Sequence, residues 1–141
     1  MAFPPYAPLS SVLAALAVVS ASACGKTVST SSFSGEQHDV AQAIANFQSD
    51  VSGGDEKKVC KDDLSATVIA RLNSATGGCR QVIKDQLAEV ESYDLAVDAV
   101  NITAPGHTAN ARVRSIYGGK THATTLSLVK EGGKWKLAGA A

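Results

Sequence analysis

The first 24 residues of the sequence contain no aspartate, glutamate, lysine or arginine. Over the whole chain of 141 residues, thirteen acidic and thirteen basic side chains give a formal net charge of zero. Nucleic-acid-binding domains and polybasic membrane-binding segments both present a clustered excess of basic side chains. We therefore expect no nucleic acid partner, and any attachment to a membrane must use another device.

Aromatic residues are also scarce: there are one tryptophan, three tyrosines and three phenylalanines. The apolar part of the chain consists mainly of alanine, valine, leucine and isoleucine. A chain of this length suffices for one domain with a hydrophobic core and is short for two. The composition therefore predicts one domain whose core is built from small aliphatic side chains.

A long hydrophobic run is missing as well. Residues 9–23 form a run of about 15 small or apolar residues, whereas a transmembrane helix needs roughly 20. A run of this length, ending in small residues, is typical of a secretory signal peptide. Residues 21–24, Ala-Ser-Ala-Cys, resemble the lipobox of bacterial lipoproteins, which implies that Cys24 is diacylated and becomes the new N-terminus.

We therefore expect a signal peptide over residues 1–23, and a lipidated Cys24 with a flexible tether, rich in serine and threonine, over residues 24–35. The expected location is the outer face of the bacterial cell membrane, and the membrane is the first expected partner. One alternative is an ordinary signal peptide cut after Ala23, which leaves Cys24 as a free thiol in a secreted protein. The other is an anchor that is not cleaved.

Two cysteines, Cys60 and Cys79, remain once Cys24 is assigned to lipid. Export places them in an oxidising compartment, where paired cysteines normally form a disulfide. A redox dithiol usually has the spacing C-x-x-C, which is absent here, and a metal site needs further ligands that are not nearby in sequence. We therefore predict a structural disulfide between them, no metal site and no cofactor.

The spacing of apolar residues changes near Tyr93. Before it, residues 36–51 show apolar side chains in steps of three and four, which predicts a helix. Shorter helices are expected over residues 55–60 and 65–73, where an aspartate and a serine are suitable caps, and a further one over residues 79–90.

After Tyr93 apolar and polar residues alternate, which predicts strands. Four are expected: they lie over residues 95–103, 109–117 and 122–129 and around Trp135. In the first strand Leu95 and Val97 are out of phase with Val100 and Ile102, so we predict a bulge near Asp98. Helices followed by antiparallel strands indicate an α+β fold, with the N-terminal helices packed on one face of a curved antiparallel sheet of about four strands.

The order of these features resembles small actinobacterial lipoproteins with an NTF2-like (SnoaL-like) domain, a cone of the cystatin-like kind. The matching segments are VAQAIANFQSDVSGGDEKKVC, GGCRQVI and LSLVKEGGKWKLAG. The resemblance implies an NTF2-like domain over residues 36–141, with a pocket between helices and sheet. Most members of the family have no assigned activity, so the resemblance leaves any reaction open.

Enzymes of this fold aim an acid or base into an apolar cavity. His122, in phase with Leu126 and Leu128, and Tyr117 are the candidate catalytic residues, although each is also a plausible residue of the sheet margin. No catalytic dyad or triad emerges from the sequence. Trp135, between two lysines, is interpreted as a core residue, with a binding platform as the alternative.

The sequence thus favours an exported, lipid-anchored envelope protein that binds a small apolar ligand or an envelope protein without catalysis. One alternative is a small enzyme of the isomerase or cyclase type that uses His122 in its pocket. The other is a purely structural envelope protein, in which helices and sheet pack together without a cavity.

The anchor yields a direct prediction. The wild-type protein should be recovered in the membrane fraction, and mass spectrometry should find a diacylglyceryl group on an N-terminal Cys24. The variant Cys24→Ser should lose the modification and leave the membrane fraction, because no other residue of that segment can carry the thioether. An unmodified Cys24 in the wild-type membrane fraction would contradict the prediction.

Overall fold

The structure, a computed structural model, describes residues 28–89, 94–117 and 119–141. The elements in chain order are α1 (Gly35–Ser52), α2 (Glu56–Lys58), the π-helical η1 (Val59–Asp63), α3 (Ala66–Asn73), α4 (Gly78–Ala88), β1 (Asp94–Ala104), β2 (Thr108–Tyr117), β3 (Lys120–Glu131) and β4 (Lys134–Ala140). The strands form one antiparallel sheet in the order β1-β2-β3-β4. The expected α+β class, with helices followed by a four-stranded antiparallel sheet, is confirmed.

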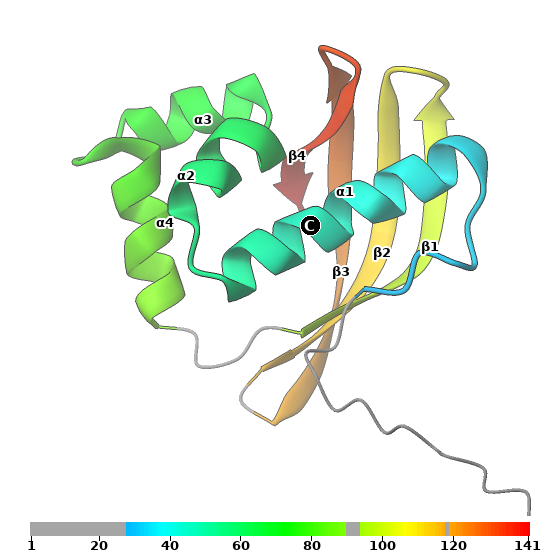
Figure 1. Cartoon of the computed structure of the whole chain (residues 1–141), viewed down its shortest axis with the longest axis horizontal. Coiled ribbons are helices and arrows are strands. Elements are labelled where there is room, and N and C mark those ends of the chain that lie inside the picture. Colours follow the sequence, from blue (N-terminus) through cyan, green and yellow to red (C-terminus); the bar gives the residue numbers. More distant parts are fainter. Residues whose placement is uncertain (1–27, 90–93, 118) are drawn as a thin grey trace, which may run out of the picture.

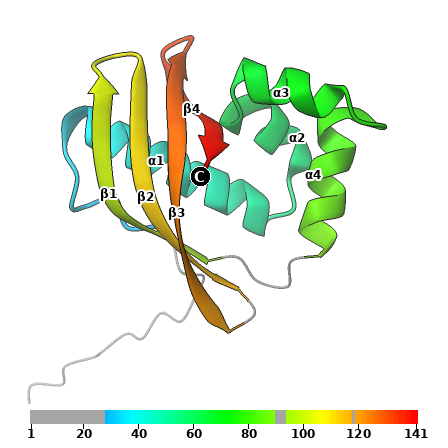
Figure 2. The same ribbon diagram turned by 180° about the vertical axis from the view of Figure 1, so that it is seen from behind.

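The helix α1 crosses one face of the twisted sheet, and α2, α3 and α4 gather beside the β4 edge (Figure 1). Seen from behind, the opposite face of the sheet carries none of the described helices (Figure 2). The core therefore lies between α1 and the covered face of the sheet.

The periodicity of α1 explains how it packs. Val40, Ala41 and Ile44 are fully buried, and Gln48 continues the same stripe one turn later. Phe47 and Val51, which the sequence also placed inward, are only partly buried against this core. The opposite side of α1 is polar and remains available for a site.

The sheet presents its alternating apolar residues to α1. Each of the strands β2, β3 and β4 buries every second side chain, and these residues are Ala109, Ala111, Val113, Ser115, Leu126, Leu128, Trp135 and Leu137. In β1 the register shifts between Val97 and Ala99, so Leu95 and Val100 are both buried despite their odd spacing. The predicted bulge at Asp98 is confirmed.

Two glutamines of α1 cover the edge of β1. The Gln37 amide donates to the carbonyl of Val100 at 3.0 Å, and the Leu95 N–H donates to Gln48 Oε1 at 2.6 Å. An uncovered strand edge exposes unpaired backbone groups. These two hydrogen bonds therefore fix α1 along the sheet as well as across it.

The second helix differs from its expected range, residues 55–60. Asp55 caps it as predicted, by accepting a hydrogen bond from the Lys58 N–H, but α2 continues into η1 and ends only at Asp63. The Leu64 N–H donates to the carbonyl of Val59, the i→i+5 bond of a π-helix. This wider turn buries Asp63 together with Val59 and Cys60, because all three then face the core.

The expected signal peptide and Cys24 lie outside the described residues, whereas part of the expected tether lies within them. Val28 is buried in the core at 6% exposure, and Phe33 packs against that core. From residue 28 on, the chain is therefore part of the folded domain. If Cys24 is the anchor point, the free tether is much shorter than the sequence suggested.

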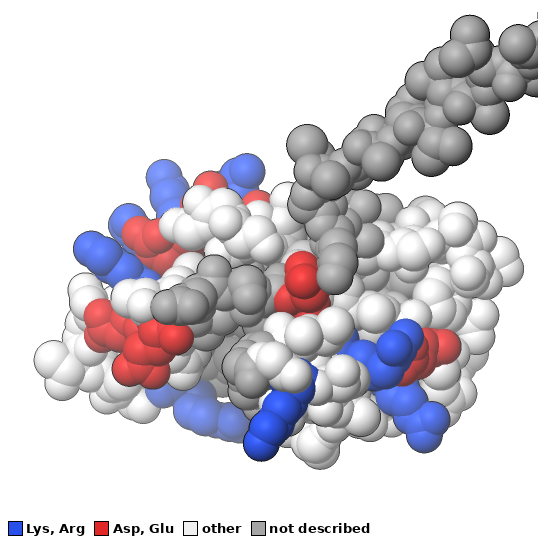
Figure 3. All heavy atoms as spheres, turned by 90° about the horizontal axis from the view of Figure 1, so that it is seen from below, with Lys and Arg blue, Asp and Glu red and all other residues white. Residues whose placement is uncertain are grey.

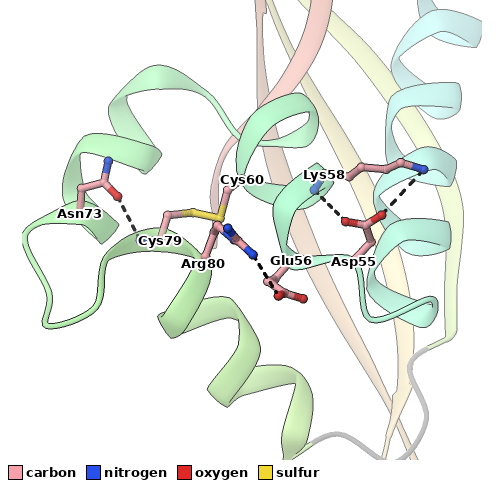
Figure 4. The surroundings of a disulfide bond; sticks show 7 residues. All are labelled: Asp55, Glu56, Lys58, Cys60, Asn73, Cys79 and Arg80. Atoms are coloured by element: carbon pink, nitrogen blue, oxygen red, sulfur yellow. Dashed lines mark hydrogen bonds and ion pairs between the residues drawn. A yellow bond between two sulfur atoms is a disulfide. The ribbon is translucent and has the colours of Figure 1, made fainter.

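The predicted disulfide joins Cys60 of η1 to Cys79 of α4, with the Cα atoms 6.1 Å apart. Around it, the Cys79 N–H donates to Asn73 Oδ1 at 3.0 Å, and Arg80 lies 3.7 Å from Glu56 (Figure 4). Among the described residues of α3 and α4 only Cys79 is buried, and the apolar side chains that pack against the core are partly buried: Val68, Ile69, Leu72 and Ile83. The disulfide therefore adds a covalent link to this partly buried contact.

Replacing both cysteines tests this role. The variant Cys60→Ser/Cys79→Ser should lose about 3 kcal/mol of unfolding free energy, because the disulfide no longer restricts a loop of this size in the unfolded chain. Urea unfolding of the variant and of the reduced wild type should show the same loss. A midpoint in urea equal to that of the oxidised wild type would contradict the prediction.

Candidate functional site

A groove of about 670 Å³ lies between α1, η1 and the turn from β3 to β4. The polar side of α1 forms one wall, at positions one helical turn apart, with Asp39, Gln42, Asn46, Ser49 and Asp50. The other walls come from η1 and from the ends of β3 and β4. This groove is therefore polar, in contrast to the apolar pocket that the sequence favoured.

Asp63, at the end of η1, is the most unusual residue of the groove. Its side chain is only 6% exposed, and no N–H or O–H donor of the described residues reaches its Oδ2. Burial raises the pKa of this carboxyl from 3.8 to about 7, with smaller contributions from the charge of Asp50, a hydrogen bond to Asp50 and the charge of Asp62. Lys136 acts in the opposite direction.

Below about pH 7, Asp63 is therefore largely protonated, and the nearby charge of Asp50 contributes to this. Two such carboxyl groups cannot both ionise at close range without a large repulsion. Lys58 lies on the other side of Asp50, with its Nζ 3.9 Å from Asp50 Oδ1. Asp63 thus offers a neutral carboxyl to the groove below about pH 7, and Asp50 lines the same groove.

Trp135 of β4 lines the groove from the sheet side. It is 6% exposed, and its indole N–H has no acceptor among the described residues. Lys130 lies over the ring with its Nζ 5.7 Å from the ring centroid, and the same Nζ is 3.9 Å from Glu36. The interpretation as a core residue is correct, and Trp135 is in addition a wall of the groove.

The two candidate catalytic residues lie elsewhere. His122 is partly buried near the start of β3, opposite Ser115 of β2, whereas the groove reaches β3 at its other end, at Lys130. His122 is not among the residues that line the groove. The side chain of Tyr117 lies outside the described residues, and its backbone ends β2 opposite Lys120.

A second hollow, of about 420 Å³, lies at the opposite end of the sheet. Leu95, Val97 and Ile116 give it a more apolar lining, and Arg114 closes one side. Arg114 is held there by Asp98, whose carboxylate is 2.8 Å from its Nε. The bulge residue Asp98 therefore has a structural role.

No helix in the described part of the chain is long and apolar enough to cross a membrane. Within the same residues, no group of three or more histidine, cysteine, aspartate or glutamate side chains is arranged to hold a metal ion. Acidic and basic side chains are intermixed on the surface seen from below (Figure 3).

Sequence reasoning missed Asp50, Asp63 and the groove. The acidic residues of α1 and η1 look like ordinary solvent-facing side chains, since acidic residues are common on helix surfaces. The π-helical turn of η1 places Asp63 in the protein interior, and no residue pattern in this segment predicts a π-helix. The one available signal was the polar stripe on α1 opposite its apolar one.

No protein-family model matches the chain, and no curated protein matches it. Among solved structures, a designed NTF2-like protein, a variant of Rd1NTF2_05, is similar to it with a TM-score of 0.48 and 15% sequence identity. The alignment covers 74% of this chain and 96% of that chain.

The Asp63 carboxyl predicts a particular dependence of stability on pH. Its raised pKa means that between about pH 4 and 7 the folded state holds a proton that the unfolded state has lost, so the free energy of unfolding falls as the pH rises through this range. The loss amounts to at most about 4 kcal/mol and is complete above about pH 7. The variant Asp63→Asn should lack this fall and should be more stable than the wild type at pH 8.

Urea unfolding at several pH values measures the effect. Asp39→Asn, which changes an exposed aspartate of the same groove, is the matched control and should keep the wild-type profile. An Asp63→Asn profile that falls as steeply as the wild-type one would show that Asp63 titrates normally.

Proposed function

We propose that this chain is an exported, lipid-anchored envelope protein whose domain binds a polar ligand in the groove between α1 and the β3–β4 turn. The observation that carries the proposal is Asp63, a buried carboxyl that lines a sizeable groove and whose Oδ2 has no hydrogen-bond partner among the described residues. A buried ionisable group costs stability, and perturbed groups of this kind concentrate at functional sites. The NTF2-like identity of the fold and the lipoprotein origin are parts of the same proposal.

Binding fits the groove better than catalysis does. Two neighbouring carboxyl groups can act as acid and base, so the preference for binding is based on the other residues of the lining. The remaining lining residues offer amides, hydroxyls and lysines, and no histidine or cysteine is among them. The groove is thus suited to hold a molecule by hydrogen bonds.

The attachment at Cys24 would keep the domain close to the membrane. Three residues separate Cys24 from the buried Val28, so the chain between their Cα atoms spans at most about 14 Å. The ligand would therefore be met at the membrane surface or in the envelope layer directly above it.

The binding role can be tested without knowing the ligand. The full chain is dialysed to equilibrium against a small-molecule extract of the cells that produce it, and mass spectrometry identifies retained compounds. Asn46→Phe fills the groove from an exposed position of α1, and Gln86→Phe makes the same change on the exposed surface of α4. A compound should be retained by the wild type and by Gln86→Phe but not by Asn46→Phe.

Three results would contradict the proposal. The first is that Asn46→Phe retains the same compounds as the wild type, and the second is that neither protein retains any compound. The third is that a compound disappears and a new product forms in the presence of the protein, which would support the alternative that the protein is an enzyme.

A further inference from the structure

The walls of the groove offer hydrogen bonds rather than apolar surface. Of its lining residues, only Ala43 and Gly133 have no polar atom in the side chain. On α1 the Gln42 amide donates to Asn46 Oδ1 at 3.1 Å, so each of these two side chains keeps further donor or acceptor capacity toward the groove. These groups form hydrogen bonds with water when the groove is empty of ligand. An apolar molecule would displace that water and offer no hydrogen bonds in its place, which costs free energy.

The charges of the groove nearly cancel. Four aspartates and three lysines line it, so their formal charges differ by one. Two of the lysines are already engaged, because Lys58 lies 3.9 Å from Asp50 and Lys130 lies 3.9 Å from Glu36. The lining therefore gives little attraction to an ion of either sign.

Two buried polar groups at the groove lack hydrogen-bond partners of opposite kinds. The indole N–H of Trp135 has no acceptor, and Asp63 Oδ2 has no donor, among the described residues. A hydroxyl group both donates and accepts, so hydroxyl groups of one molecule can satisfy both. Less than 1 Å² of each atom is exposed, so a ligand reaches them only when a side chain of the groove wall rotates. At Trp135 this side chain is Lys130, whose Nζ lies over the ring.

On the basis of the binding role proposed above, we infer that the groove takes a neutral, hydroxyl-rich ligand, a saccharide or polyol. Its hydroxyl groups accept from Trp135, donate to the Asp50–Asp63 pair, and exchange hydrogen bonds with Gln42 and Asn46. The Trp135 ring adds an apolar surface for the C–H face of a sugar once Lys130 has moved.

The single tryptophan of the chain makes the test specific. In the full ¹⁵N-labelled chain the indole N–H resonance belongs to Trp135 alone, so it reports directly on the groove. The protein is titrated separately with maltotriose and chitotriose as neutral saccharides, and with spermidine, citrate and toluene as a cation, an anion and an apolar molecule. At least one trisaccharide should shift this resonance saturably.

Variants on the exposed wall locate the contact. The double variant Gln42→Leu/Asn46→Leu should weaken the binding of that trisaccharide by about tenfold or more, because the ligand loses hydrogen bonds to both amides. Gln86→Leu, an exposed glutamine on α4, should leave the affinity unchanged. Both affinities are measured by calorimetry, and amide spectra verify that the variants are folded.

The outcomes separate the two proposals. If spermidine, citrate or toluene shifts the indole resonance and neither trisaccharide does, the groove binds a ligand of another class and the inference is wrong. If all five probes leave the indole resonance unchanged, or shift only resonances outside the groove, the binding role of the groove is overturned as well. Equal affinity in the double variant would also contradict the inference.

Discussion

The packing of α1 against the sheet is the contact on which the rest of the structure depends. Its stripe of Val40, Ala41 and Ile44 is fully buried, and two glutamines on the same helix hydrogen-bond the edge of β1. Because of the helical periodicity, the polar residues of α1 lie on its opposite side, where they line the groove together with the turn from β3 to β4. The groove wall is therefore a direct consequence of the core.

The second constraint is the junction between η1 and β4. The Ser65 N–H donates to the carbonyl of Leu137 at 2.8 Å, and Leu64 pairs with Leu137 in a parallel bridge. The chain therefore reaches β4 directly after Asp63, with the carboxyl held beneath α1. Burial there costs free energy when Asp63 ionises, and a binding role offers a reason for a fold to keep such a group.

The fold was largely predictable from the sequence because its signals are local. Helical spacing, caps at Asp55 and Ser65 and strict alternation in the strands each depend on neighbouring residues. The bulge at Asp98 followed from a phase change within one strand, and the disulfide from the two cysteines that remain in a chain expected to be exported. The NTF2-like resemblance and the lipid anchor remain predictions.

The candidate site was not predictable, because it depends on contacts between distant segments. Asp50 and Asp63 belong to different helices, and only the π-helical turn of η1 brings the second carboxyl inside. His122 was a candidate because it lies on the same face of β3 as Leu126 and Leu128. The alternation of a strand predicts the face on which a side chain lies, but it does not predict which end of the strand adjoins a groove. Trp135 was correctly placed in the core, yet its second role needs the neighbouring helix.

The most direct test of this account is the titration of Asp63 itself. The ¹³Cγ resonance of this carboxyl can be followed from acid to alkaline pH in the folded protein, with Asp39 as an exposed reference in the same spectra. The account predicts a midpoint near pH 7 for Asp63. A midpoint near the ordinary value of 3.8 would show that the carboxyl is not held in a buried environment beside Asp50, and the proposed site would lose its basis.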